Sequence, residues 1–219
     1  MYRLCIFDLD GTLLNTVSAL MYSTNQTLAA FGLGTVGPEQ IKQMVGDGYK
    51  KQMERALRSF GEEALQYHEA SLPIYMENFA KYCMKDVVPY EGIPELLDYL
   101  KKKKLLIAVF SNKPHHQAVE NIRQVFGENF FDLVRGEQAG IPKKPAPDGA
   151  LAICRELSVR PQECLYLGDT NTDMKTGAAA GMDTVGVTWG FRSRGELESF
   201  GPKYLVDHPD EVRQLLEER

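Results

Sequence analysis

Short apolar runs recur along the chain and are separated by longer stretches in which apolar residues follow helical spacing. The runs are rich in branched side chains and are bounded by turn residues, which is typical of buried strands. They cover residues 3–7, 105–110, 131–134, 164–167, 184–188 and 204–206. This alternation predicts βαβ units, and therefore an α/β fold with a Rossmann-like parallel-sheet core.

Residues 15–87 break this rhythm, because no convincing strand falls among them. Four helical patterns follow one another instead, over residues 16–31, 38–46, 49–60 and 62–84. Pro73 is expected to kink or split the last of them. We therefore predict an all-α domain over residues 15–87, inserted into an α/β core that consists of residues 1–14 and 88–219.

The composition is that of an ordinary globular protein with an acidic balance. Of the 219 residues, 43% are hydrophobic and 25% are charged, and the formal net charge is −5. This charge argues against nucleic acid or an anionic membrane as the main partner. No apolar run approaches the roughly 20 residues that span a bilayer. A strand is expected to begin within three residues of Met1, and we therefore expect no signal peptide.

The cysteines are scattered and form neither a CxxC pair nor the spacing of a zinc site. They are Cys5, Cys83, Cys154 and Cys164. We interpret them as free thiols in a reducing compartment, and we expect a cytoplasmic monomer or homodimer.

Two carboxylates follow the first apolar run. Asp8 comes directly after it, Asp10 follows two positions later, and Gly11 allows a sharp turn. Neighbouring carboxylates often divide their roles, so that one stays ionised as a nucleophile or metal ligand while the other carries a proton. An Asp-Gly turn without function is the alternative, and these residues alone do not decide between the two.

Three further groups of polar residues follow later runs. They are Ser111-Asn112-Lys113, Lys143-Lys144-Pro145, and Asp169 with Asp173. Each has an ordinary structural explanation as a helix start, a solvated loop or a helix cap. All of them, however, are expected just past the carboxyl ends of strands, where open parallel sheets bind their ligands. Their shared position therefore favours a single site.

Together these residues resemble the four motifs of the haloacid dehalogenase superfamily of phosphohydrolases. The motifs are Asp8-Leu9-Asp10-Gly11-Thr12, Ser111-Asn112, Lys144-Pro145, and Gly168-Asp169 with Asp173. The chain is similar to the phosphoglycolate-phosphatase-like group, which carries an α-helical cap between the first two motifs. The core match covers residues 2–14 and roughly 88 to the C-terminus. Asn15 departs from the pattern, because relatives often carry Asp there.

The resemblance implies a role for each catalytic residue. Asp8 is expected to attack the substrate phosphorus and form an aspartyl-phosphate. Asp10 would protonate the leaving oxygen and then activate water. Lys144 would offset the negative charge of Asp8 and of the phosphate.

The resemblance also implies ligands for a metal ion and for the phosphate. Mg²⁺ would be held by Asp8, by Asp169 and by the backbone carbonyl of Asp10, because this hard cation prefers oxygen. The phosphate-binding residues would be Thr12, Ser111 and Asn112. Asp173 is expected to orient Lys144 or a water on the metal rather than to bind the metal directly.

A glycine-flanked loop in the inserted domain is the candidate for substrate selection. The residues expected to contribute are Gly46, Asp47, Lys50, Lys51 and Arg55. A helix N-terminus follows the loop and suits an anion. A plain turn between helices with solvated lysines explains the same residues equally well.

The predicted function is a Mg²⁺-dependent phosphatase acting on a small phosphorylated metabolite, with 2-phosphoglycolate as the first candidate. Pyrophosphate or a nucleoside monophosphate would also suit the lysines of the loop. A sugar phosphomutase shares the fold and the phospho-enzyme. A binding protein without catalysis would be expected to lack the nucleophile, and Asp8 is present.

Overall fold

The computed structural model describes residues 1–217 and divides into two compact units. The first unit contains Met1–Leu14 together with the chain from Pro89 onward, and the second contains Asn15–Val88. Two short strands, β2 (Leu14–Asn15) and β3 (Val88–Pro89), pair where the chain passes between the units. No helix within residues 1–217 is long and apolar enough to cross a membrane.

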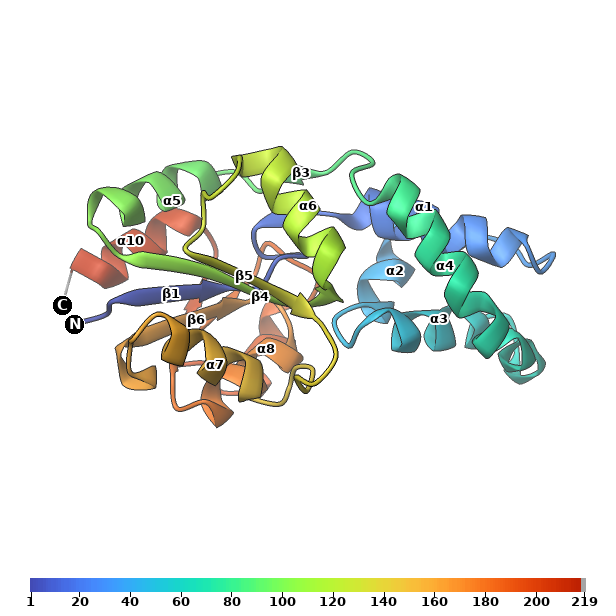
Figure 1. Ribbon diagram of the computed structural model, residues 1–219. Helices are drawn as coiled ribbons and strands as arrows, with labels where there is room; N and C mark the ends of the chain where they lie inside the picture. The colour runs from blue at the N-terminus through green and yellow to red at the C-terminus, as the bar shows by residue number, and fades with distance from the viewer. Residues whose placement is uncertain (218–219) are drawn as a thin grey trace. The chain divides into compact units, whose positions relative to one another are not determined.

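The first unit is built on a six-stranded sheet in which every neighbouring pair is parallel (Figure 1). Its spatial order is β5-β4-β1-β6-β7-β8. The strands are β1 (Leu4–Phe7), β4 (Leu106–Pro114), β5 (Leu133–Glu137), β6 (Cys164–Gly168), β7 (Asp183–Val187) and β8 (Tyr204–Val206). The predicted α/β fold with a Rossmann-like parallel sheet is confirmed.

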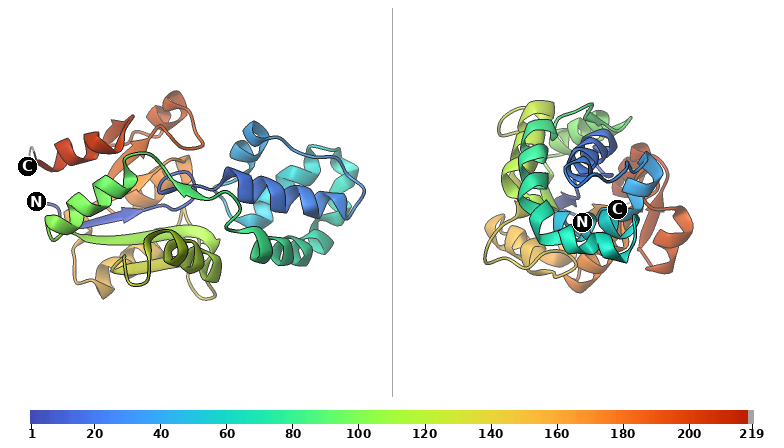
Figure 2. Two further views of the ribbon diagram at one scale, coloured as in Figure 1. Left: turned by 90° about the horizontal axis from the view of Figure 1, so that it is seen from above. Right: turned by 90° about the vertical axis from the view of Figure 1, so that its right-hand side faces the viewer.

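Helices cover both faces of this sheet, as the views in Figures 1 and 2 show. Helices α5, α6 and α10 lie on one face, and α7 and α8 lie on the other. The helices of this unit are α5 (Ile93–Lys102), α6 (His115–Phe126), α7 (Asp148–Glu156), α8 (Asn171–Ala179), α9 (Arg194–Ser199) and α10 (Pro209–Glu217). A 3₁₀ turn, η2 (Pro161–Glu163), precedes β6. Because helices cover both faces of the sheet, β1 is buried throughout, and its sequence is a continuous apolar run.

Strand β1 lies between β4 and β6 in a common register. Phe7 pairs with Val109 on one side and with Leu167 on the other. The chain continues to β4 in one direction and later crosses back to β6 in the other, so the strand order reverses at β1. This reversal creates the crevice at which α/β sheets bind ligands.

Strand β4 extends beyond its predicted end at Phe110. It runs to Pro114, which pairs with Glu137 of β5 after a shift of register that follows Phe110. Ser111, Asn112 and Lys113 therefore belong to an irregular strand end and not to the start of a helix. Irregularities of this kind redirect side chains and are frequent beside functional sites.

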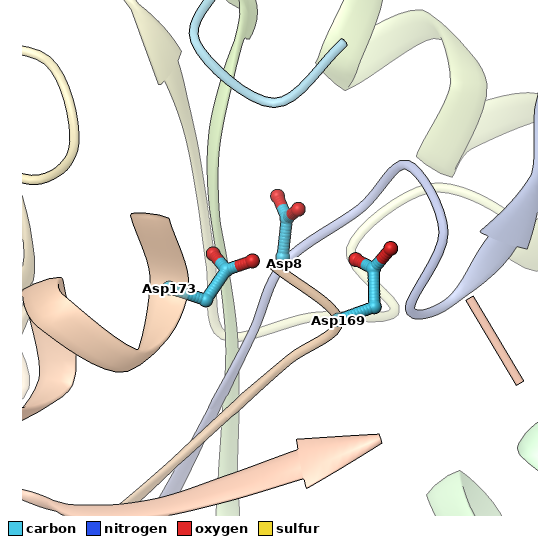
Figure 3. Close-up of side chains that lie close together, drawn as sticks. All are labelled: Asp8, Asp169 and Asp173. Atoms are coloured by element: carbon cyan, nitrogen blue, oxygen red, sulfur yellow. The ribbon is translucent and has the colours of Figure 1, made fainter. Parts of the chain in front are cut away.

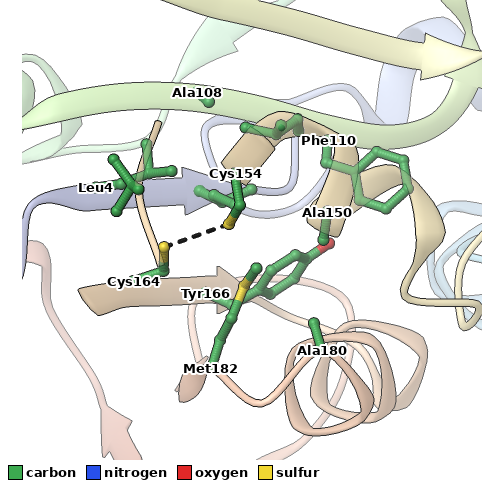
Figure 4. Packing of buried hydrophobic residues seen from close by; sticks show 12 residues of the cluster. Leu4, Ala108, Phe110, Ala150, Cys154, Cys164, Tyr166, Ala180 and Met182 are labelled. Carbon is green, nitrogen blue, oxygen red and sulfur yellow. Dashed lines mark hydrogen bonds between the residues drawn. The ribbon is translucent and has the colours of Figure 1, made fainter. Parts of the chain in front are cut away.

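An apolar core fills the space between the sheet and helix α7 (Figure 4). Cys154 of α7 and Cys164 of β6 are buried within it as free thiols, and their sulfur atoms lie 3.5 Å apart. Tyr166 is fully buried in the same cluster. The cysteines here act as small apolar side chains.

The second unit is helical. Its elements are α1 (Val17–Ala29), α2 (Pro38–Met44), α3 (Tyr49–Arg58), the 3₁₀ helix η1 (Glu62–Tyr67) and α4 (His68–Tyr82). The predicted fourth helical stretch is divided, but the division falls between η1 and α4, before Pro73, which lies inside α4. Tyr75 and Phe79 are buried and stack with ring centroids 5.5 Å apart, so they form part of this unit's core.

Candidate active site

Three carboxylates meet at the carboxyl edge of the sheet (Figure 3). Asp8 follows β1, Asp169 follows β6, and Asp173 lies in the first turn of α8. One oxygen from each lies within 4.8 Å of the others, and all three residues are buried. The shared register of β1 and β6 explains why residues so distant in sequence come together.

Gly11 allows the loop after β1 to approach Asp169. Its φ is +88°, a conformation that side chains with a Cβ rarely adopt. A Cβ atom placed there would lie 2.2 Å from Oδ2 of Asp169. The glycine is therefore required both by the turn and by the contact.

Two hydrogen bonds fix the carboxylate of Asp169. The hydroxyl of Thr12 donates to Oδ1 at 2.9 Å, and the backbone N–H of Phe191 donates to Oδ2 at 2.8 Å. Thr12, for which phosphate binding is predicted, thus uses its hydroxyl to hold a neighbouring carboxylate.

The segment after β7 packs directly against the first motif. The indole N–H of Trp189 donates to the backbone carbonyl of Thr12 at 3.0 Å. A Cβ on Gly190 would lie 2.4 Å from the carbonyl oxygen of Gly11. From the sequence, the position of this segment just past a predicted strand allows it to border the site, although packing is the more ordinary role for Trp189 and Phe191.

Lys144 connects two of the three carboxylates. Its Nζ lies 2.8 Å from Oδ1 of Asp8 and 2.6 Å from Oδ1 of Asp173, and its side chain is only 2% exposed. The ammonium group therefore stands between the predicted nucleophile and the first turn of α8.

Asn112 positions the backbone of Lys144. Its side-chain amide donates to the carbonyl of Lys144 at 3.0 Å, and its Oδ1 accepts from the N–H of Lys144 at 2.9 Å. The peptide bond between Lys144 and Pro145 is cis. Asn112, predicted to bind phosphate, therefore uses its side chain to anchor the loop that carries the lysine.

The carboxylates carry more negative charge than the lysine balances. Burial raises the pKa of Asp8 to about 7, although the positive charge of Lys144 opposes the shift. Burial, followed by the charges of Asp173 and Asp8, also raises the pKa of Asp169 well above its usual range. Burial alone would lower the pKa of Lys144, but Asp173 and Asp8 together raise it well above its ordinary value. A centre of this kind attracts a cation.

The carboxylate of Asp10 forms an ion pair with a second lysine, Lys113, and not with Lys144. The Nζ of Lys113 lies 2.8 Å from Oδ1 of Asp10, and the lysine side chain is 1% exposed. Ser111, on the same strand end, is buried, and its hydroxyl accepts from the N–H of Lys113 at 3.2 Å. The sequence places Lys113 in the polar group after this strand, but it predicts no role for the lysine.

The predicted substrate-selecting residues lie in the second unit, around the start of α3. Arg55 forms an ion pair with Asp47 and donates to the carbonyl of Met44 at 2.9 Å. Lys51 pairs with Glu54 at 2.8 Å, and Lys50 is exposed. Gly46 takes a positive φ of 110° in the loop that precedes them.

An all-parallel α/β core with a buried acidic cluster at the carboxyl edge of its sheet is the arrangement of an α/β enzyme. The model of the haloacid dehalogenase-like hydrolases matches residues 5–187. The chain belongs to this family.

Similar proteins agree with this family. A phosphoglycolate phosphatase from Aquifex aeolicus is 31% identical, over 98% of this chain and 97% of the relative. An N-acetylmuramic acid 6-phosphate phosphatase from Pseudomonas aeruginosa is also 31% identical, over 97% of this chain and 93% of the relative. A crystal structure from Lactobacillus delbrueckii subsp. bulgaricus superposes with a TM-score of 0.91 at 29% identity and covers 98% of each chain. The predictions of the family and of an enzyme that hydrolyses phosphoric monoesters are confirmed.

Proposed function

We propose that the protein is a Mg²⁺-dependent phosphatase that forms an aspartyl-phosphate on Asp8. One observation carries the proposal: the Asp8 carboxylate lies within a buried acidic group and in contact with a buried ammonium. A carboxylate in this setting is shielded from water and held near positive charge, which suits attack on an anionic phosphoryl group.

The donor set fits magnesium. Asp8 and Asp169 offer carboxylate oxygens from adjacent strand ends, and Asp10 would add its backbone carbonyl. Asp173 is engaged by Lys144 at 2.6 Å, which favours a supporting role for it. When bound, Mg²⁺ would offset the charge of the approaching phosphoryl oxygens, which otherwise repel the attacking carboxylate.

The remaining steps use side chains of the first unit. Asp8 attacks the phosphorus in line and the bond between phosphorus and the leaving oxygen breaks. Asp10 donates a proton to this oxygen, so the dephosphorylated part of the substrate leaves as an alcohol while the phosphoryl group stays on Asp8. Asp10 then accepts a proton from the water that attacks the aspartyl-phosphate, and Asp8 and inorganic phosphate are released. Ser111, the backbone N–H of Asn112 and the ammonium of Lys144 would bind phosphoryl oxygens during both transfers.

The proposed substrate is 2-phosphoglycolate, which the relatives' names support. We propose that the helical unit Asn15–Val88 acts as the cap that selects the substrate. Its contributing residues would be Gly46, Asp47, Lys50, Lys51 and Arg55. The proposal also includes a cytoplasmic monomer or homodimer, and the four buried free cysteines favour a reducing compartment.

A sugar phosphate is the second candidate substrate. The N-acetylmuramic acid 6-phosphate phosphatase matches this chain with the same identity as the phosphoglycolate phosphatase from Aquifex aeolicus. Overall similarity therefore does not separate an acidic two-carbon phosphate from a phosphorylated sugar.

Phosphate release from a substrate panel tests the proposal. The panel contains 2-phosphoglycolate, hexose phosphates, N-acetylmuramic acid 6-phosphate, pyrophosphate and nucleoside monophosphates, each with and without Mg²⁺. We expect metal-dependent release that Asp8→Asn abolishes, and release that survives in the matched variant Asp98→Asn, whose side chain is exposed on α5. Phosphate release by Asp8→Asn would refute the assigned nucleophile. Isomerised product without free phosphate would instead identify a phosphomutase.

A further inference from the structure

A second buried lysine lies beside the proposed acid. The side chain of Lys113 is 1% exposed, and its ammonium nitrogen lies 2.8 Å from Oδ1 of Asp10. The Asp10 side chain is 16% exposed, so the carboxylate remains accessible to solvent whereas the lysine that pairs with it does not. Buried lysines are rare unless they are paired, and this one is paired with the group that transfers the proton in the proposed reaction.

Two contacts restrict the backbone of Lys113, one at its N–H and one at its carbonyl oxygen. Its N–H donates to the hydroxyl of Ser111 at 3.2 Å. Its carbonyl oxygen would lie 2.5 Å from a Cβ atom built on Gly136 of β5, so only glycine permits this approach of the strands. The lysine therefore extends from a rigid point and has little freedom to follow a moving carboxylate.

The two buried lysines serve different carboxylates. Lys144 contacts Asp8 and Asp173. Lys113 contacts Asp10 from the end of β4. In the sheet, β4 lies next to β1 on the side opposite β6. Lys113 is thus paired with the proposed acid, whereas Lys144 is paired with the proposed nucleophile and with Asp173.

We propose that Lys113 is a positioning residue that holds the Asp10 carboxyl group in the orientation from which it protonates the leaving oxygen. This inference rests on the proposed phosphatase function. It predicts that the loss of Lys113 affects substrates in proportion to their need for an acid. Alkyl phosphates release a strongly basic oxygen and need the proton, whereas p-nitrophenyl phosphate releases a stable phenolate and needs it little.

The test compares kcat/KM for two substrates, because this ratio reports the steps up to transfer of the phosphoryl group onto Asp8. The variant is Lys113→Met, and the matched control is Lys102→Met, which removes an exposed lysine of α5. For the best alkyl phosphate of the panel we expect Lys113→Met to lower kcat/KM by about 10- to 100-fold, part of the full effect of an acid. For p-nitrophenyl phosphate we expect a change below about threefold, and Lys102→Met should alter neither value.

A double variant shows whether Lys113 acts through Asp10. In an Asp10→Asn background, Lys113→Met should lower kcat/KM for the alkyl phosphate by less than about threefold, because the group it positions is already gone. Equal losses for both substrates, or a full additional loss in the double variant, would overturn the proposal. If Lys113→Met does not fold, Lys113→Arg keeps the charge, changes the donor geometry and carries the same comparison. A wild-type protein without phosphatase activity would instead refute the proposed function.

Discussion

Gly11 shows how one missing side chain maintains the site. The residue combines a φ of +88° with a distance of 2.2 Å between its built Cβ and Oδ2 of Asp169. Backbone strain and steric overlap thus act at the same position, and both act on a carboxylate that Thr12 and Phe191 already hold.

Replacing Gly11 by alanine should separate these two effects when it is compared with Gly127→Ala. Gly127 has a φ of +96° and no atom within 4 Å of a built Cβ, so its substitution adds backbone strain alone. We expect Gly127→Ala to lower the free energy of unfolding by about 1 kcal/mol. Gly11→Ala should lower it by a further 1–3 kcal/mol or so and abolish phosphate release. Equal unfolding temperatures for the two variants would contradict the overlap at Asp169.

The element that most affects the site is the irregular end of β4. It delivers Asn112 to the backbone of Lys144 and Lys113 to Asp10. A strand that ended at Phe110 would place neither side chain, so the extension to Pro114 builds two separate parts of the site.

Asn112→Ala should weaken both the fold and the reaction. The change removes two buried hydrogen bonds to the backbone of Lys144 and leaves an N–H and a carbonyl without them. We expect the free energy of unfolding to fall by about 2 kcal/mol, and phosphate release to fall at least about tenfold. Both of these bonds of the Asn112 side chain are to the backbone of Lys144 and not to the proposed metal ligands. The Mg²⁺ affinity measured by calorimetry should therefore change less than kcat. Unaltered kcat would show that the loop holds Lys144 without Asn112.

The sequence predicts the site residues whose signals are local, but not the contacts that depend on how distant elements pack. The runs before Asp8 and Asp169 predict buried strands, and parallel strands that end together bring these carboxylates together. Asn112 is predicted as a phosphate ligand, but its bond to the backbone of Lys144 and the pairing of Lys113 with Asp10 depend on a shift of register between β4 and β5, which no local pattern reveals. The bond from the N–H of Phe191 to Asp169 depends on the pairing of β7 with β6, which no local pattern reveals either.

For the whole molecule, ionisation of the buried acidic cluster should lower the free energy of unfolding, and this effect should depend on pH. Asp8 has a raised pKa of about 7 in the folded protein, against an ordinary value of 3.8. Between these values the folded chain binds more protons than the unfolded chain. The stability of the metal-free protein therefore falls as the pH rises from about 4 to about 7.

Asp8→Asn should remove this dependence, because an amide does not titrate. Thermal unfolding in the presence of a chelator, at pH 5 and at pH 8, measures it. We expect the variant to gain stability relative to the wild type between these two pH values, and each 1 kcal/mol would appear as about 2–4 °C. Asp98→Asn, on an exposed part of α5, should show no such gain. A difference between Asp8→Asn and wild type that is the same at both pH values would show that Asp8 is ionised at no cost.

The central place of β1 has a consequence for protein synthesis. This strand is synthesised before its neighbours β4 and β6. The bond from Thr12 to Asp169 joins residues 157 positions apart. The whole compact unit Asn15–Val88 is also synthesised before either neighbour. During synthesis the apolar strand β1 is therefore without its partners, and exposed apolar surface of this kind is prone to aggregate.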